Sequence, residues 1–397
     1  MTELNLDTHS ARLSRRALLR ASGGAISAGA IAQVARAEED DMLKVPRILG
    51  RNGVREYMYV PGSWYDHLEH VRSALKSLNG GLAGSAGFKS SAIIRHPETY
   101  GGKKGFQIRL EIDREKFDGE IPRQVGGIPT KIIEPRERRP ACCGSHCDWN
   151  KCDFDPTPGG VRVFSDGGGG GTMCCWVERN GNYRVLTAAH IEDGASCDSM
   201  EFNQGDGWDQ WSQNLGGLQH WDINTDYALI DKSAGNHTPT DKIRIESETL
   251  TVYGVYSSTA VANNVQDDET CGDDEDNIYQ MGVHSGRTQG CITAMNSTND
   301  DNHVCWDYNG YGVEFGPQNI ISGDSGGPVF EDGGSYAYIV CLTSAHLSEY
   351  GTDCGNRDVG SYGEGTAAYH LRNNEGLTFD LTGRGLNAPN CTGGGCC

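Results

Sequence analysis

Three residues far apart in the chain have the types that nucleophilic catalysis requires. His190 ends the run TAAH, Asp226 begins the run DYALI, and Ser325 lies in the run GDSGGPV. A serine hydroxyl is a weak nucleophile and needs a base within hydrogen-bond reach, and histidine titrates near neutral pH. A buried carboxylate can orient the imidazole and stabilise the imidazolium that forms. Together the three side chains would make an alcohol reactive, provided that the fold brings them to one point.

The glycines beside Ser325 suit the same chemistry. They let the backbone turn so that two N–H groups point at one spot. Such donors stabilise a developing oxyanion, by about 2.7–4 kcal/mol for each donor removed in other enzymes.

The elements that must position these residues are short apolar strands. Tyr183–Leu186 precedes the histidine run, Tyr227–Ile230 follows the aspartate, and Ile320-Ile321 precedes the serine run. Glycine makes up 55 of the 397 residues, roughly twice the usual share. Many glycines together with β-branched runs predict many turns and an all-β body.

The three runs, in this order and with separations of 36 (226 − 190) and 99 (325 − 226) residues, resemble a chymotrypsin-like (trypsin-fold) serine protease. The pattern Gly282-x3-Gly286-x3-Gly290-x-Ile292 resembles bacterial secreted members of the α-lytic and streptogrisin types. The resemblance covers about 158–372. It implies two antiparallel six-stranded β-barrels, with the active site in the crevice between them.

The resemblance also implies roles for individual residues. His190 would be the general base, Asp226 its orienting acid and Ser325 the nucleophile, with the N–H groups of Gly323 and Ser325 forming the oxyanion hole. Asp222, four residues upstream of Asp226, is the competing acid.

Substrate contacts are expected further along the chain. In the family, the segment that holds Ser344, Ala345 and His346 pairs with substrate backbone as an added strand, and its serine approaches the catalytic acid. Asn319 stands six residues before Ser325, where trypsins have an aspartate. A neutral amide there predicts no selection of Lys or Arg by charge. His346, if protonated, would favour an acidic side chain.

Two departures from the family are visible. Position 191 is Ile where a cysteine often follows the histidine, and we expect Cys174 or Cys175 to pair with Cys197 instead. No Arg-Ile-Val-Gly-Gly activation site occurs, so the group that balances Asp324 is left open.

The N-terminal 37 residues read as an export signal. Ser14-Arg15-Arg16 begins a charged region, a small-residue apolar stretch follows, and Ala35-Arg36-Ala37 fits a cleavage site. The paired arginines resemble a twin-arginine signal, which predicts a secreted protein. An ordinary amphipathic N-terminus is the alternative. No cysteine lies near the cleavage site, so a lipoprotein anchor is not expected.

Residues 38–140 are predicted to form a small α/β domain. Apolar residues recur at helical spacing from Trp64 to Leu78, and Gly80-Gly81 would end that helix. Alternation over 106–113 predicts a half-buried strand, with Arg109 and Glu111 on its polar face, and a second strand is expected over 131–134. The domain is either a pro-region that holds the protease inactive or a permanent accessory domain.

The net charge of the chain changes sign at residue 140, where this predicted domain ends. Residues 1–140 hold 23 Lys/Arg and 17 Asp/Glu, a sum of +6, and residues 141–397 hold 11 and 37, a sum of −26. A basic segment can dock on an acidic body. An acidic body argues against nucleic-acid binding and is typical of proteins from very salty media, and no apolar stretch is long enough to span a membrane.

All 15 cysteines lie at or after Cys142, which predicts disulfides and an oxidising compartment. We expect bridges Cys291–Cys305 and Cys341–Cys354, a Cys-rich linker over 141–157 and a Cys/Gly-rich tail over 373–397. The cluster 142–152, which includes His146, is an alternative zinc site. Otherwise no cofactor is expected, although clustered carboxylates over 267–276 could hold structural calcium.

The predicted function is therefore secreted endopeptidase activity on proteins or peptides, through an acyl-enzyme. Two rivals are open. One is a non-catalytic, disulfide-stapled binding protein on a protease scaffold, because fold does not imply function. The other is an esterase with the same chemistry.

Overall fold

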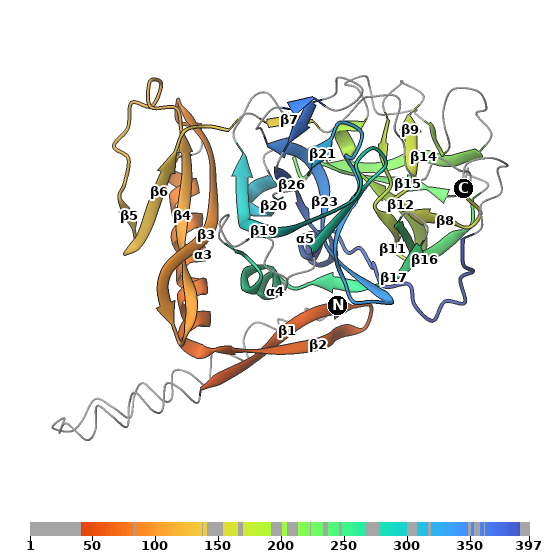
Figure 1. Cartoon of the computed structure of the whole chain (residues 1–397), viewed down its shortest axis with the longest axis horizontal. Helices are drawn as coiled ribbons and strands as arrows, with labels where there is room; N and C mark the ends of the chain where they lie inside the picture. Colours follow the sequence, from red (N-terminus) through yellow and green to blue (C-terminus); the bar gives the residue numbers. More distant parts are fainter. Residues whose placement is uncertain are drawn as a thin grey trace.

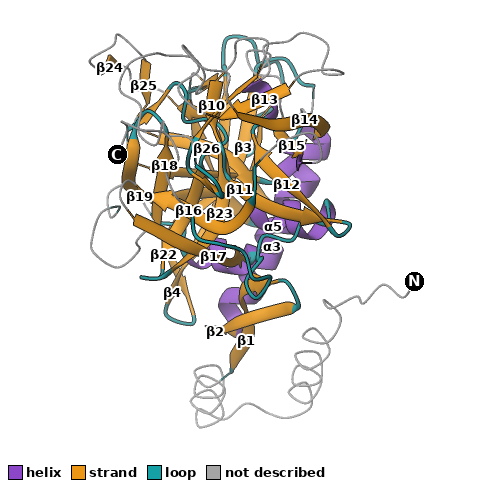
Figure 2. Ribbon diagram, turned by 90° about the vertical axis from the view of Figure 1, so that its right-hand side faces the viewer, coloured by secondary structure: helices purple, strands orange, loops and turns teal. Residues whose placement is uncertain are grey.

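The computed structural model describes residues 41–82, 84–136, 138–140, 154–165, 170–191, 201–204, 213–222, 224–232, 237–245, 248–266, 271, 278–299, 308–316, 319–347, 351–352, 358–360 and 362–389. The predicted export signal, the clusters 142–152 and 267–276 and the end of the tail lie wholly or mostly outside these residues. The described chain is mostly β (Figure 2). Its helices are α3 (Gly62–Leu82), α4 (Ser258–Asn263), α5 (Ala368–Asn374) and the 3-10 turns η2 (Ala189–Ile191) and η4 (Tyr308–Gly310).

The first barrel is an antiparallel sheet in the order β10-β9-β13-β14-β15-β12-β11. Its two end strands are consecutive in the chain and act as one bent strand. At the bend, the Met173 N–H donates to Val161 O on one side and the Cys174 N–H donates to Leu186 O on the other, so the sheet curls back on itself. The strands are β9 (Arg162–Ser165), β10 (Gly170–Thr172), β11 (Cys175–Arg179), β12 (Asn182–Thr187), β13 (Glu201–Gln204), β14 (Gln213–Asp222) and β15 (Tyr227–Asp231).

The second barrel is a closed antiparallel ring of six strands, in the order β18-β19-β20-β26-β23-β22 and back to β18. The strands are β18 (Ile278–Gly282), β19 (Gly286–Asn299), β20 (Gly312–Gly316), β22 (Pro328–Asp332), β23 (Tyr336–Leu347) and β26 (Tyr362–Ala367). The predicted fold class, an all-β body of two barrels behind a small α/β domain, is confirmed.

Shorter strands lie around the two barrels. β17 joins the edge of the second barrel by pairing parallel with β23, while β21 belongs to a small separate sheet. These strands are β8 (Thr157–Gly159), β16 (Pro239–Ile245), β17 (Glu248–Tyr256), β21 (Ile320–Ile321), β24 (Gly351–Thr352) and β25 (Asp358–Gly360).

Residues 41–136, here called the N-terminal unit, place α3 against one face of β3 and β4 (Figure 1). The predicted apolar stripe of the helix, from Trp64 to Leu78, is buried against the core strands, and the helix ends at Leu82, one residue past the predicted glycine pair. The strands are β1 (Met42–Gly50), β2 (Gly53–Pro61), β3 (Phe88–Tyr100), β4 (Lys103–Ile112), β5 (Gln124–Val125) and β6 (Ile128–Ile133).

The N-terminal unit continues the sheet of the second barrel. β3 pairs with β19, β1 pairs with β17, and the following strand β7 (Arg138–Pro140) pairs with β23. This packing overturns one prediction. Arg109 and Glu111 on β4 were expected to face solvent, but both are buried, because the second barrel covers that face of the strand.

The packing of the first barrel extends past Arg372, the expected end of the protease domain. After α5 the chain returns to the barrel, and Leu377, Phe379 and Leu381 join its buried cluster. Thr378 also pairs with Glu178 of β11. In the part of the chain described, no helix has both the length and the apolar composition needed to cross a bilayer.

The cysteine pairing differs from the prediction. Cys291 is bonded to Cys271, not to Cys305, because the two sulfurs meet beside the carbonyl of Gly316 at the edge of the second barrel. Cys341 is a free thiol in the middle of β23, where the core encloses it, so the bridge to Cys354 is wrong. Cys174 and Cys175 are also free and buried, so neither bridges to Cys197. Burial raises the pKa of the Cys174 and Cys341 thiols.

Candidate active site

Strand pairing in the first barrel brings the candidate base and acid together. β12 and β15 are neighbours, with Thr187 opposite Ala228, so the turn after one strand lies beside the start of the other. His190 sits in η2, just past the end of β12, and Asp226 directly precedes β15. Asp226 has a φ of +49°, a left-handed conformation that aspartate tolerates better than most residues.

The second barrel supplies Ser325, from the turn between β21 and β22. The distance between Ser325 Oγ and His190 Nε2 is 2.6 Å. On the other side of the ring, His190 Nδ1 lies 2.8 Å and 2.9 Å from the two carboxylate oxygens of Asp226. The His190 backbone N–H also donates to that carboxylate, at 3.0 Å. Asp226 and Ser325 are fully buried, so water does not compete for these bonds.

The competing acid, Asp222, has other partners. Its carboxylate accepts hydrogen bonds from the Asn224 N–H at 2.9 Å and from the Thr225 hydroxyl at 2.9 Å. These bonds shape the turn that presents Asp226. The geometry therefore favours Asp226 over Asp222 as the partner of His190.

The turn around Ser325 is tightly constrained. Gly323 has a φ of +105°, and a Cβ on it would lie 2.1 Å from the ring of His284, so only glycine fits. Within the part of the chain that is described, neither the Gly323 N–H nor the Ser325 N–H has a hydrogen-bond partner. Both amides are therefore available to an incoming oxygen, as an oxyanion hole requires.

Backbone amides balance the negative charge of the Asp324 carboxylate. The sequence alone did not identify this partner. Its carboxylate is fully buried and accepts hydrogen bonds from the N–H groups of Ile321 at 2.8 Å, His284 at 3.0 Å and Ser285 at 3.0 Å. Burial raises the pKa of Asp324, and these amides and His284 oppose that rise. The loop 283–285 thus fixes the serine turn, and its only signal in the sequence was its place within the glycine pattern.

Ser344 contacts the nucleophile through its backbone. Its carbonyl oxygen accepts a hydrogen bond from the Ser325 hydroxyl at 3.2 Å. Its own hydroxyl is buried and has no hydrogen-bond partner among the described residues. The structure therefore places Ser344 at the site through its backbone, and its hydroxyl makes no hydrogen bond to Asp226.

The two remaining substrate-binding candidates differ in their exposure to solvent. Asn319 is exposed. His346 is buried on β23, opposite Gly363 of β26. The edge of β23 that was expected to receive substrate carries β7 of the same chain, with Ala345 opposite Pro140 and His346 opposite Arg139.

Among the described residues, no group of three or more His, Cys, Asp or Glu side chains is arranged to hold a metal ion. The predicted alternatives, zinc at 142–152 and calcium at 267–276, lie almost entirely outside that part of the chain.

No protein-family model matches the chain, and no curated protein matches it. The solved structures similar to it include a glutamic-acid-specific serine protease described as using a histidine triad in substrate binding (TM-score 0.40, 17% identity, 56% of this chain and 99% of that one). They also include Thermobifida fusca protease A (0.38, 18%, 56% and 96%) and Cellulomonas bogoriensis chymotrypsin (0.38, 17%, 56% and 96%). These likenesses are distant in both sequence and shape.

Proposed function

We propose that the chain is a serine endopeptidase that hydrolyses peptide bonds through an acyl-enzyme. One observation carries the proposal: His190 Nε2 lies 2.6 Å from Ser325 Oγ while His190 Nδ1 lies 2.8 Å from Asp226. A nucleophile bonded to a base, and a base oriented by a third group, is the arrangement that nucleophilic catalysis needs.

In the proposed reaction, Ser325 Oγ attacks the carbonyl carbon of the substrate and its proton passes to His190 Nε2. The charge on the carbonyl oxygen is stabilised by the N–H groups of Gly323 and Ser325, and Asp226 stabilises the imidazolium. His190 then gives the proton to the leaving amine as the C–N bond breaks. Water repeats the two steps on the ester and releases the acid product.

We further propose that the protein is secreted, through the signal in residues 1–37, and that residues 38–140 are a pro-region. Two observations support a pro-region. β7 lies on the part of β23 expected to pair with substrate, and arginines of the N-terminal unit bond to acids of the later chain, such as Arg47 to Glu331 at 2.6 Å.

Labelling with a serine-directed fluorophosphonate tests the chemistry. We expect the probe to modify Ser325 and the Ser325→Ala protein to stay unlabelled and inactive on casein. A folded protein that is neither labelled nor active, even after residues 1–140 have been removed, would instead be a binding protein. Faster hydrolysis of simple esters, with casein left intact, would indicate an esterase.

A further inference from the structure

β7 lies where an extended peptide would add to the second barrel. Arg138–Pro140 pairs antiparallel with β23, with Pro140 opposite Ala345. The preceding residue of β23, Ser344, contacts the Ser325 hydroxyl through its carbonyl oxygen. Strand addition of this kind gives a peptide affinity through its backbone and specificity through its side chains. The chain just before β7 therefore shows which side chains the neighbouring surface accepts.

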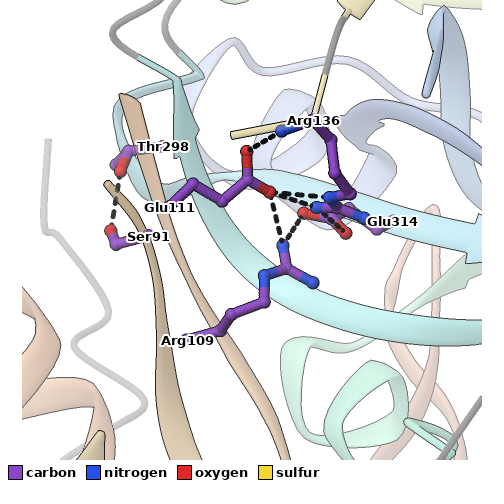
Figure 3. Close-up of polar contacts among 6 residues, drawn as sticks. All are labelled: Ser91, Arg109, Glu111, Arg136, Thr298 and Glu314. Atoms are coloured by element: carbon purple, nitrogen blue, oxygen red, sulfur yellow. Dashed lines mark hydrogen bonds and ion pairs between the residues drawn. The ribbon is translucent and has the colours of Figure 1, made fainter. Parts of the chain in front are cut away.

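Arg136, four residues before Pro140, reaches a buried carboxylate of the second barrel. Its Nη2 atom lies 2.8 Å from Oε2 of Glu314. Figure 3 shows the two side chains pointing toward one another. Glu314 is on β20, and its side chain is fully buried. It stands opposite Glu364 of β26, which is also buried, and directly opposed residues of an antiparallel pair share a face of the sheet.

The N-terminal unit supplies the cations for this acidic surface. Among the described residues, the ion-pair partners of Glu314 are Arg109 of β4 and Arg136, and both belong to the N-terminal unit. If that unit leaves, Glu314 stays beside Glu364 without either guanidinium. Like charges directly opposite each other on neighbouring strands are destabilising, so a cation from another molecule would be favoured there.

We propose that Glu314 forms a remote substrate subsite, which selects a basic side chain, preferably arginine, at the position that Arg136 takes in this chain. The proposal rests on the endopeptidase function and the pro-region proposed above, because Arg109 and Arg136 occupy Glu314 until the N-terminal unit leaves. It gives the protein a preference for substrates with a positive charge four residues before the one that pairs with Ala345. Arginine suits the subsite because its planar guanidinium can donate two parallel hydrogen bonds to one carboxylate.

The test uses protein expressed as the full chain and incubated until its mass no longer changes. Its substrate is a peptide that copies residues 131–145, with Cys142→Ser and Cys143→Ser, and a second peptide carries citrulline in place of Arg136. We expect the citrulline peptide to have about tenfold lower kcat/KM, mainly through a higher KM, because a charged hydrogen bond is lost from binding. A third peptide with Lys131→Gln loses the same charge elsewhere and should behave like the first.

Equal kcat/KM for the arginine and citrulline peptides would overturn the subsite and leave the endopeptidase function intact. If no peptide is cleaved and Ser325 is not labelled by fluorophosphonate, the proposed function fails and the subsite fails with it. In the Glu314→Gln protein the preference for arginine should vanish, whereas Glu248→Gln, an exposed acid on β17, should keep it. The peptide comparison on the unaltered protein stands even if Glu314→Gln does not fold.

Discussion

At the scale of single residues, the site depends on close approach of backbones around Ser325. Gly326 has a φ of +83°, and a Cβ on it would lie 2.1 Å from the carbonyl oxygen of Thr172 and 2.2 Å from the hydroxyl of Thr187. Thr172 and Thr187 belong to the first barrel, whereas Gly326 follows the nucleophile on the second. The glycine therefore allows the two barrels to meet at the distance that the His190–Ser325 hydrogen bond needs.

Replacing Gly326 tests this close approach, with Gly181 as a matched control. Gly181 lies in the β11–β12 turn with a φ of +81°, and a Cβ there would meet no atom within 4 Å. In a Ser325→Ala background, Gly181→Ala should cost about 1–2 kcal/mol of unfolding free energy, from its backbone conformation alone. Gly326→Ala should cost roughly 1–3 kcal/mol more, because it also overpacks the contact. Urea unfolding measures both, and equal losses would contradict the role assigned to Gly326.

At the scale of elements, the sequence predicted what depends on local pattern. Helix α3 follows from its apolar spacing, and the strands that flank the triad follow from their short apolar runs. The burial of Arg109 and Glu111 could not be predicted, because alternation shows that a strand has a polar face but not what covers it. The residue that packs on Arg109 is Glu314 of the second barrel, which lies about 200 residues further along the chain.

In the candidate site, too, the sequence predicted some features and could not predict others. His190, Asp226 and Ser325 stand in runs specific enough to be identified by inspection, and the fold brings all three together. The partners of Asp324 are backbone amides, which carry no residue signature. The Cys271–Cys291 bridge likewise depends on how two distant segments meet, and neither spacing nor count reveals that.

The ion pairs of Glu314 predict a pH dependence of stability. Burial alone would raise the pKa of Glu314, but Arg109 and Arg136 outweigh it and lower the pKa to about 2. An acid with a lowered pKa stabilises the fold fully above its unfolded value and loses that contribution as the pH falls. Stability of the Ser325→Ala chain should therefore decrease between about pH 4.5 and pH 2.

The matched variants assign that decrease to one side chain. Glu314→Gln should be less stable than the parent at pH 6, and the difference should shrink as the pH falls toward 2, because the parent then loses the same charge. Glu248→Gln, at an exposed position, should follow the parent throughout. Urea unfolding at a series of pH values measures the free energy of unfolding of each protein. A difference between Glu314→Gln and its parent that stays constant with pH would show that Glu314 does not titrate in this range.

At the scale of the whole molecule, opposite charge joins the two parts of the chain. The sequence sums of +6 and −26 correspond to particular pairs in the structure. Arg51 of the N-terminal unit lies 2.9 Å from Glu178 of the first barrel, and Arg55 bonds to Asp380 in the segment after α5. The N-terminal unit therefore contacts both barrels, and the strand that follows it, β7, pairs with the edge of β23 that we propose as the substrate-binding edge.

This arrangement predicts the mature form of the protein. If residues 38–140 are a pro-region, full activity requires a cut after residue 140, because only then can β7 leave β23 for a substrate. N-terminal sequencing and the intact mass of the active secreted protein should place its first residue beyond Pro140. An active protein that begins at Glu38 would contradict the pro-region and make the N-terminal unit a permanent domain. If the Ser325→Ala protein keeps residues 38–140 while the unaltered protein loses them, the chain cleaves itself after residue 140.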